Sequence, residues 1–117
     1  MQHKDKNIII IEKMLKYCDK ILDIKDKENL TKEKYMSSDI IQLAMDMCIF
    51  QLTELSIHID DDFKIKHLNI PWAQIKGMRN IHAHEYDKID RNIIWNTIDN
   101  DILELKEKLD SISKTKQ

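Results

Sequence analysis

The chain has 117 residues, of which 42% are hydrophobic and 34% are charged, and its formal net charge at pH 7 is -2. This length suits one domain with a modest core, and the single Gly and single Pro leave almost no material for hairpins or glycine-rich phosphate loops. The composition therefore predicts one all-α domain over residues 1–117 and excludes binding of nucleic acid through the overall charge.

Two further features bear on where the protein resides. Cys18 and Cys48 both lie within apolar helical patterns, which is typical of buried free thiols in a reducing compartment. The apolar run at residues 8–11 is too short for a signal peptide, and no stretch approaches the length that crosses a membrane. We therefore expect a cytoplasmic protein with no membrane partner.

The first predicted helix covers residues 6–23, because its apolar side chains recur at intervals of three and four residues. The members of this face include Ile8, Ile11, Leu15, Cys18 and Leu22. Residues 24–38 are mostly polar, and a short helix or a turn fits them equally well.

The next predicted helix begins at Ser38 or Asp39, either of which suits an N-cap. It carries the clearest heptad pattern of the chain: Ile41, Met45, Cys48, Leu52, Leu55 and Ile59. A second stripe flanks the first: Ile40, Ala44, Met47, Gln51 and Glu54. Because this stripe contains small and polar side chains, one interpretation is that it contacts a subunit partner or the histidines described below. The other is that it rims the core in contact with water.

The second half begins with three consecutive acids, residues 60–62, which predict the end of that helix and a solvated loop to about Asn69. Pro71 then suits the first turn of another helix. Within that helix, Gly77 indicates close backbone packing that excludes a side chain. The last predicted helix covers residues 90–111 with Asp90 as its cap, and its apolar face consists of Ile94, Ile98, Ile102, Leu105, Leu109 and Ile112.

The chemically distinctive stretch lies between these two helices. Within eight consecutive positions the chain carries Arg79, Asn80, His82, His84 and Tyr86. An arginine offers a planar cation that suits a phosphate, and a histidine can take or give a proton near neutral pH. Residues 63–91 hold six Lys or Arg against three acids, a local formal charge of +3. These groups suit cleavage of RNA without a metal, which needs a base, an acid and a cation for the phosphorane.

Helical geometry restricts how such a site can form. On one straight helix, Arg79 and His84 stand about 140° apart. Either the helix ends between them and the chain turns back, or a second copy of the stretch, brought by a two-fold partner, completes the site. His82 and His84 point about 200° apart, so a metal would need an extended segment and outside ligands. We expect neither a metal nor a cofactor.

The pattern Arg-x4-His-x-Tyr, formed by Arg79, His84 and Tyr86 with Asn80 after the arginine, resembles the signature of the HEPN superfamily, and most closely its HepT-like branch. The resemblance is specific over residues 70–109 and is limited before them to helical layout and the neighbourhood of residues 52–54. It implies a homodimeric HEPN-type bundle of four to five helices.

The same resemblance implies a function. The chain would be the ribonuclease toxin of a type VII-like toxin–antitoxin pair, with Arg79 and His84 as catalytic residues across a homodimer cleft. Asn80 would bind the RNA or orient the site, and His82, at a variable position of the motif, would be a supporting residue at most. Tyr86 would accept AMP groups from a cognate nucleotidyltransferase antitoxin.

The residues leave other interpretations open. The chain could be a catalytically idle dimeric module that binds a nucleotide or docks a nucleotidyltransferase, although intact Arg79, Asn80 and His84 favour the enzyme. A metal-binding helical protein is disfavoured by the spacing of its histidines. For Tyr86 alone, the alternative to modification is packing on the dimer seam.

Overall fold

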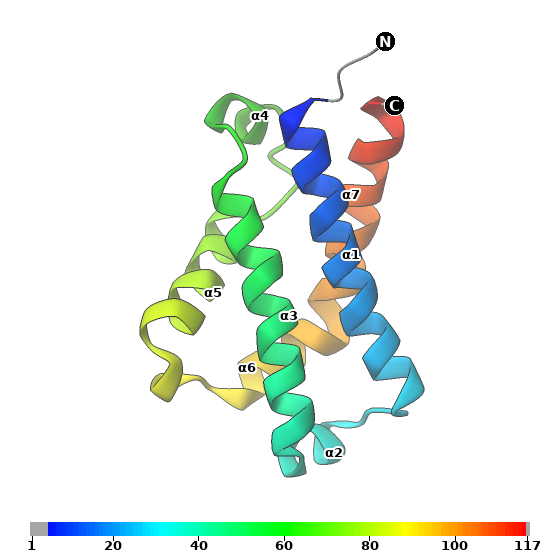
Figure 1. Ribbon diagram of the computed structural model, residues 1–117, viewed down its shortest axis with the longest axis vertical. Coiled ribbons are helices and arrows are strands. Elements are labelled where there is room, and N and C mark those ends of the chain that lie inside the picture. The colour runs from blue at the N-terminus through cyan, green and yellow to red at the C-terminus, as the bar shows by residue number, and fades with distance from the viewer. Residues whose placement is uncertain (1–4, 117) are drawn as a thin grey trace.

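The computed structural model describes residues 5–116, and that part of the chain contains helices and turns but no strand (Figure 1). The longer helical segments are α1 (Lys6–Lys27), α3 (Asp39–Ile57), α5 (Trp72–His84) and a continuous stretch made of α6 (Arg91–Asn96), the π segment η2 (Thr97–Asp101) and α7 (Ile102–Lys116). The shorter ones are α2 (Lys32–Ser37), α4 (Asp61–Lys66) and the 3-10 turn η1 (Tyr86–Lys88). The all-α prediction is confirmed. Of the short helices, α2 lies in the segment that the sequence left as a short helix or a turn, and α4 was not predicted.

The core lies between α1, α3 and α7, and α5 packs on the far side of α3 (Figure 1). Most members of each predicted apolar face are buried, and the whole set along the last helix is, whereas Leu15, Leu22, Ile41 and Leu55 are only partly buried. Side chains cap four helix starts: Asp5 accepts from the N–H of Asn7, Thr31 from that of Lys34, Ser38 from that of Ile41, and Asp90 from that of Asn92. These bonds satisfy N–H groups that a helix start leaves without partners. Cys18 and Cys48 are buried free thiols, as predicted.

Residues 24–38, which the sequence left as a short helix or a turn, contain the end of α1 and the short helix α2. α1 continues four residues beyond the predicted end and stops where Asn29 adopts a φ of 46°, a left-handed conformation that asparagine tolerates. The N–H of Leu30 then donates to the carbonyl of Lys25, which closes the last turn. α2 follows, anchored by the fully buried Tyr35.

Two sequence predictions in the second half are wrong. Residues 61–66 form helix α4 instead of a loop, because Asp61 and Asp62 favour its N-terminus while Phe63 is buried. Asp60 is tied to α1, since its carboxylate accepts hydrogen bonds from Lys6 and Asn7. Gly77 is not closely packed, because a Cβ placed there would meet no heavy atom within 4 Å.

Helix α3 also corrects the expectation about membranes. Among the described residues, Asp39–Ile57 is long and apolar enough to cross a membrane by length and composition alone. The same helix packs against α1, α2 and α5 and buries the charged side chain of Asp46. A single helix of this kind is weak evidence of a membrane span, because the core helix of a soluble protein passes the same test.

Candidate active site

The chemically distinctive stretch lies on α5 and on the turn that follows it. α5 runs without interruption through both Arg79 and His84, so the helix does not end between them and the first of the two predicted geometries is wrong. The helix ends at His84. The φ of -134° and ψ of 37° at its C-cap, Glu85, leave the helical region, and the 3-10 turn then carries Tyr86. Arg79 and His82 on α5 and Tyr86 on η1 all reach toward α3.

Arg79 is held by a carboxylate of α3. Its Nε donates to Oε1 of Glu54 at 2.9 Å, and its Nη2 lies 3.5 Å from Oε2 of the same residue. Its Nη1 donates to Oδ1 of Asn80 at 3.1 Å. Both members of the ion pair remain partly exposed, at 25% and 30% of their side chains. The guanidinium is therefore fixed in direction while part of its edge stays open to a ligand.

The centre of the site is a residue that was not singled out from the sequence, Asp46 of α3. Its Oδ2 accepts from the hydroxyl of Tyr86 at 2.7 Å and from Nη2 of Arg91 at 2.9 Å. Its Oδ1 accepts from Nη1 of Arg91 at 2.7 Å and lies 3.3 Å from Nε2 of His82. Burial alone would raise the pKa of the Asp46 carboxyl, but the hydrogen bonds from His82, Arg91 and Tyr86 outweigh burial and lower it to about 2.

Arg91 joins four elements around this carboxylate. Besides both oxygens of Asp46, it reaches Tyr35 of α2, because its Nη1 donates to the phenolic oxygen at 3.0 Å. Its Nη2 lies 3.5 Å from the hydroxyl of Tyr86, and its Cζ lies 5.9 Å from the centre of that ring. The hydrogen bond to Asp46 raises the pKa of Arg91 further above its ordinary value. Arg91 is therefore a cation that is held in place at the first residue of α6.

The two histidines of the stretch lie in different surroundings. His82 is buried, and its Nδ1 lies 3.2 Å from the carbonyl oxygen of Met78 while its Nε2 faces Asp46. His84 is exposed and forms no hydrogen bond or ion pair with any residue that the structure describes. Over residues 5–116, no three His, Cys, Asp or Glu side chains are arranged to hold a metal ion. His82 is therefore a structural link, and His84 is free to meet a ligand.

The local formal charge around the site is lower than the sequence alone indicates. Two of the six cations counted between residues 63 and 91, Arg79 and Arg91, are paired with Glu54 and Asp46 of α3. Including those two carboxylates lowers the local formal charge from +3 to +1. One signal in the sequence could have indicated this pairing: Asp46 is an acid between Met45 and Met47 in an apolar helix, and a buried acid requires a cationic or hydrogen-bonding partner.

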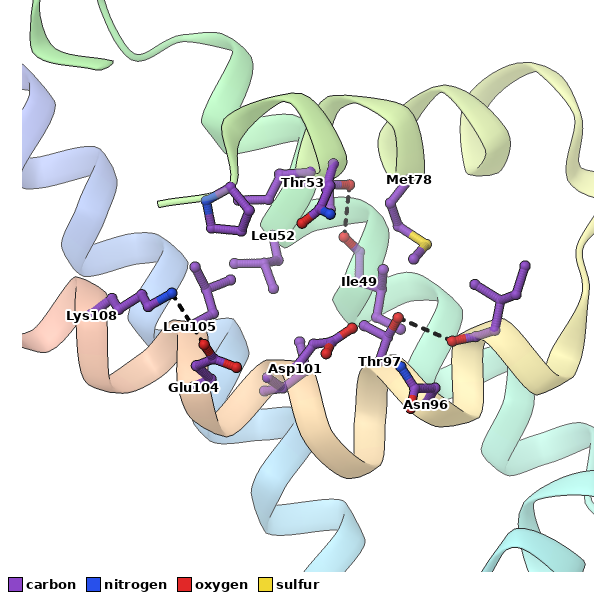
Figure 2. Close-up of a pocket in the computed structure, with 15 residues that line it drawn as sticks. Ile49, Leu52, Thr53, Met78, Asn96, Thr97, Asp101, Glu104, Leu105 and Lys108 are labelled. Carbon is purple, nitrogen blue, oxygen red and sulfur yellow. Dashed lines mark hydrogen bonds and ion pairs between the residues drawn. The ribbon is translucent and has the colours of Figure 1, made fainter. Parts of the chain in front are cut away.

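A separate cleft of about 480 Å³ lies between α3, α5 and the α6–α7 stretch (Figure 2). Its lining includes the apolar side chains of Leu52 and Leu105, and an ion pair of Lys108 with Glu104 borders it (Figure 2). Met78 lines the cleft, but none of the five candidate side chains does. The cleft is therefore distinct from the site around Arg79 and Asp46.

Comparisons with known proteins concern the chain as a whole. The family model described as Ribonuclease HepT-like matches residues 8–112. A probable ribonuclease HepT of Thermococcus cleftensis is 32% identical over 82 residues, which are 70% of this chain and 74% of the relative. A candidate RNase of Caldanaerobacter subterraneus is 28% identical over 102 residues, or 87% and 89% of the two chains. A candidate RNase of Methanocaldococcus jannaschii is 26% identical over 85 residues, or 73% and 78%. No solved structure gives a significant match.

Proposed function

Because the chain belongs to the HepT-like ribonuclease family, we propose that it is an endoribonuclease that cleaves RNA without a metal ion, with Arg79 and His84 as its catalytic residues. One observation carries this proposal: Arg79 is held in direction by Glu54 and Asn80 but keeps an open edge, while His84 is exposed at the last residue of the same helix. A fixed cation and an unengaged imidazole are the groups that phosphodiester cleavage requires.

The chemistry assigns a role to each group. The guanidinium of Arg79 would bind the phosphate and stabilise the charge that develops on the phosphorane. An imidazole would remove the proton of the 2′-hydroxyl, and a second one would donate a proton to the 5′-oxygen that leaves. One His84 cannot fill both roles in a single step. A second copy of the chain would supply the other histidine and a second arginine.

The face of α3 that borders Arg79 is suited to receive that second copy. Ile40, Leu43 and Met47 are 81%, 60% and 59% exposed and follow one another at spacings of three and four residues. Their stripe continues along the helix to Glu54, the partner of Arg79. Exposed apolar side chains that adjoin one another on a helix indicate an interaction surface. We propose a homodimer in which two such stripes pack together and bring two copies of α5 to one cleft.

The ribonuclease proposal predicts cleavage in EDTA. Purified protein incubated with total RNA and EDTA should release fragments that end in 2′,3′-cyclic phosphate, because attack by the 2′-hydroxyl forms that ring and needs no metal. End-group analysis of the fragments measures this. Cleavage that requires Mg²⁺ and leaves other ends would contradict the mechanism. Protein that binds RNA or nucleotide but never cleaves would favour the alternative, a catalytically idle binding module.

The dimer proposal predicts the effect of a charge on the α3 stripe. Met47→Glu should weaken dimerisation by at least about 100-fold, since each of two copies loses roughly 1.5 kcal/mol of apolar burial. Light scattering should show the mass falling from twice the 14.0 kDa of one chain to that of one chain, and cleavage should fall with it. Leu103→Glu is the control, because Leu103 is a 51% exposed apolar residue on α7. A monomeric parent protein, or a fully active Met47→Glu monomer, would refute the shared site.

We further propose that the chain is the toxin of a type VII-like toxin–antitoxin pair in the cytoplasm, and that a cognate nucleotidyltransferase neutralises it by adding AMP to Tyr86. Tyr86 lies two residues beyond His84, and the residue is 44% exposed. An adenylate on its hydroxyl would place a bulky anion beside the groups that receive the RNA phosphate. Charge and volume together would then exclude RNA.

A further inference from the structure

The hydroxyl of Tyr86 donates to a carboxylate of its own chain. Its Oη lies 2.7 Å from Oδ2 of Asp46, so the phenolic proton already points at a base. We propose that Asp46 is the general base when a nucleotidyl group is transferred to Tyr86, and that Arg91 holds the transferred phosphoryl group. This inference rests on the proposed modification of Tyr86. It assigns part of the machinery for that modification to the chain that is modified.

The carboxylate of Asp46 is held by three side chains and, through one of them, by a fourth. Tyr86 on η1 and Arg91 on α6 contact its carboxylate directly, and His82 on α5 faces its Oδ1. Tyr35 on α2 completes the set, because its hydroxyl accepts from the same Arg91 nitrogen that donates to Asp46. A buried carboxylate held in this way cannot turn away from the phenol, so the direction of proton transfer is set before any nucleotide arrives.

Arg91 lies beside the Tyr86 oxygen, where negative charge would develop on the transferred phosphoryl group. Its Nη2 lies 3.5 Å from the oxygen of Tyr86 that would bond to phosphorus, and 2.9 Å from Oδ2 of Asp46. A guanidinium carries five N–H donors in a plane and pairs well with the oxygens of a phosphoryl group. Its side chain is 24% exposed, which leaves an edge that a phosphate can reach.

The step is balanced without any further reactant. Oη of Tyr86 attacks the α-phosphorus of a nucleoside triphosphate, and an Oη–P bond forms. The bond from the α-phosphorus to the bridging oxygen breaks, and pyrophosphate leaves with the electron pair. The phenolic proton passes to Oδ2 of Asp46 and then to water. Afterwards the guanidinium of Arg91 lies beside both the new phosphodiester and the carboxylate, which limits their mutual repulsion.

Two mechanisms for Tyr86 predict opposite effects of removing the carboxylate. The hydrogen bond to Asp46, assisted by burial, raises the pKa of Tyr86, so Asp46 disfavours a free phenolate. If Tyr86 reacted as a phenolate, loss of the Asp46 charge would speed the reaction. If the proton leaves to Asp46 as the new bond forms, loss of the carboxylate slows the reaction, by about 100-fold or more for general base catalysis.

An adenosine that carries an aromatic sulfonyl fluoride tests this choice without the partner enzyme. The Tyr86 oxygen forms a bond to sulfur, fluoride leaves with the electron pair, and the proton must pass to a base, as in the proposed transfer. Labelling of Tyr86, mapped by peptide mass spectrometry, should be about 100-fold slower in Asp46→Asn than in the parent. Asp39→Asn, which changes an exposed acid of the same helix, should match the parent. Equal or faster labelling in Asp46→Asn would overturn the assignment.

A second measurement does not depend on the folding of that variant. In the unsubstituted protein, the labelling rate of Tyr86 should stay nearly constant from about pH 7 to about pH 9, whereas a tyrosine that reacts as a phenolate gains about tenfold per pH unit below its pKa. Tyr17, the half-buried tyrosine of α1, is the internal reference. A Tyr86 rate that rises in parallel with that of Tyr17 would overturn the role of Asp46.

Failure of this inference is separable from failure of the proposed function. Coexpression with the cognate nucleotidyltransferase shows whether adenylate reaches Tyr86 of the unsubstituted chain at all. If it does, and Asp46→Asn accepts adenylate at the parent rate, the modification stands and the base assignment falls. If no adenylate reaches Tyr86, the proposed modification falls and this inference with it, whereas the ribonuclease proposal is tested separately by cleavage in EDTA.

Discussion

Replacing either Arg79 or His84 by alanine is expected to reduce RNA cleavage by about 10²–10⁴-fold while the helical circular dichroism stays unchanged. Arg79 is held by hydrogen bonds to Glu54 and Asn80 and is not one of the buried residues of the core. His84 is exposed and makes no contact that the fold needs among the described residues. Both substitutions should therefore lower the rate of cleavage and leave the free energy of unfolding nearly unchanged. The measurement is the rate of RNA cleavage in EDTA.

Two matched controls separate the site from its surroundings. Lys76→Ala removes an exposed cation of the same helix, three residues before Arg79, and His58→Ala removes an exposed histidine at the end of α3. Each control should lower the cleavage rate only slightly. If Arg79→Ala or His84→Ala unfolds, the residue concerned has a structural role instead. If either variant cleaves at the parent rate, the proposed catalytic pair is wrong.

Tyr86→Phe is expected to escape neutralisation completely. Coexpressed with the cognate nucleotidyltransferase, the parent chain should gain one or more adenylates that map to Tyr86, and its cleavage activity should fall in proportion. Tyr86→Phe should gain none and stay active, because the hydroxyl has no part in the acid–base steps assigned to His84. Intact-mass spectra and the cleavage assay measure both effects.

The fold should tolerate this change. Loss of the hydroxyl removes one hydrogen bond to Asp46, worth about 1 kcal/mol, and Arg91 still satisfies both oxygens of that carboxylate. Tyr35→Phe is a useful comparison, because it also removes a phenolic oxygen from the network, but at a buried tyrosine. Adenylate on another residue, or a Tyr86→Phe variant neutralised as readily as the parent, would point to inhibition by simple complex formation.

Local patterns in the sequence predict the helices that carry the core and identify the residues that suit phosphodiester chemistry. Apolar spacing of three and four residues is a local property, because the helix repeat decides which side chains share a face. The buried face of the last helix and the caps at Ser38 and Asp90 could therefore be predicted. The Arg-x4-His-x-Tyr spacing could also be read directly, because it is contained within eight residues.

The partners of these residues depend on how the helices pack and could not be predicted from the sequence. Arg79 meets Glu54 across 25 residues, Tyr86 meets Asp46 across 40, and Arg91 meets Asp46 across 45. Such pairs depend on how α3, α5 and α6 cross and on their register, which the periodicity of one helix does not specify. His82 and His84 point to different sides of α5 because they are two positions apart on one helix, and the packing of α5 on α3 makes His82 a buried link while His84 stays exposed. The charges that hold the site come from α3, where the sequence left Glu54 either to meet a partner or the site or to rim the core, and gave no role to Asp46.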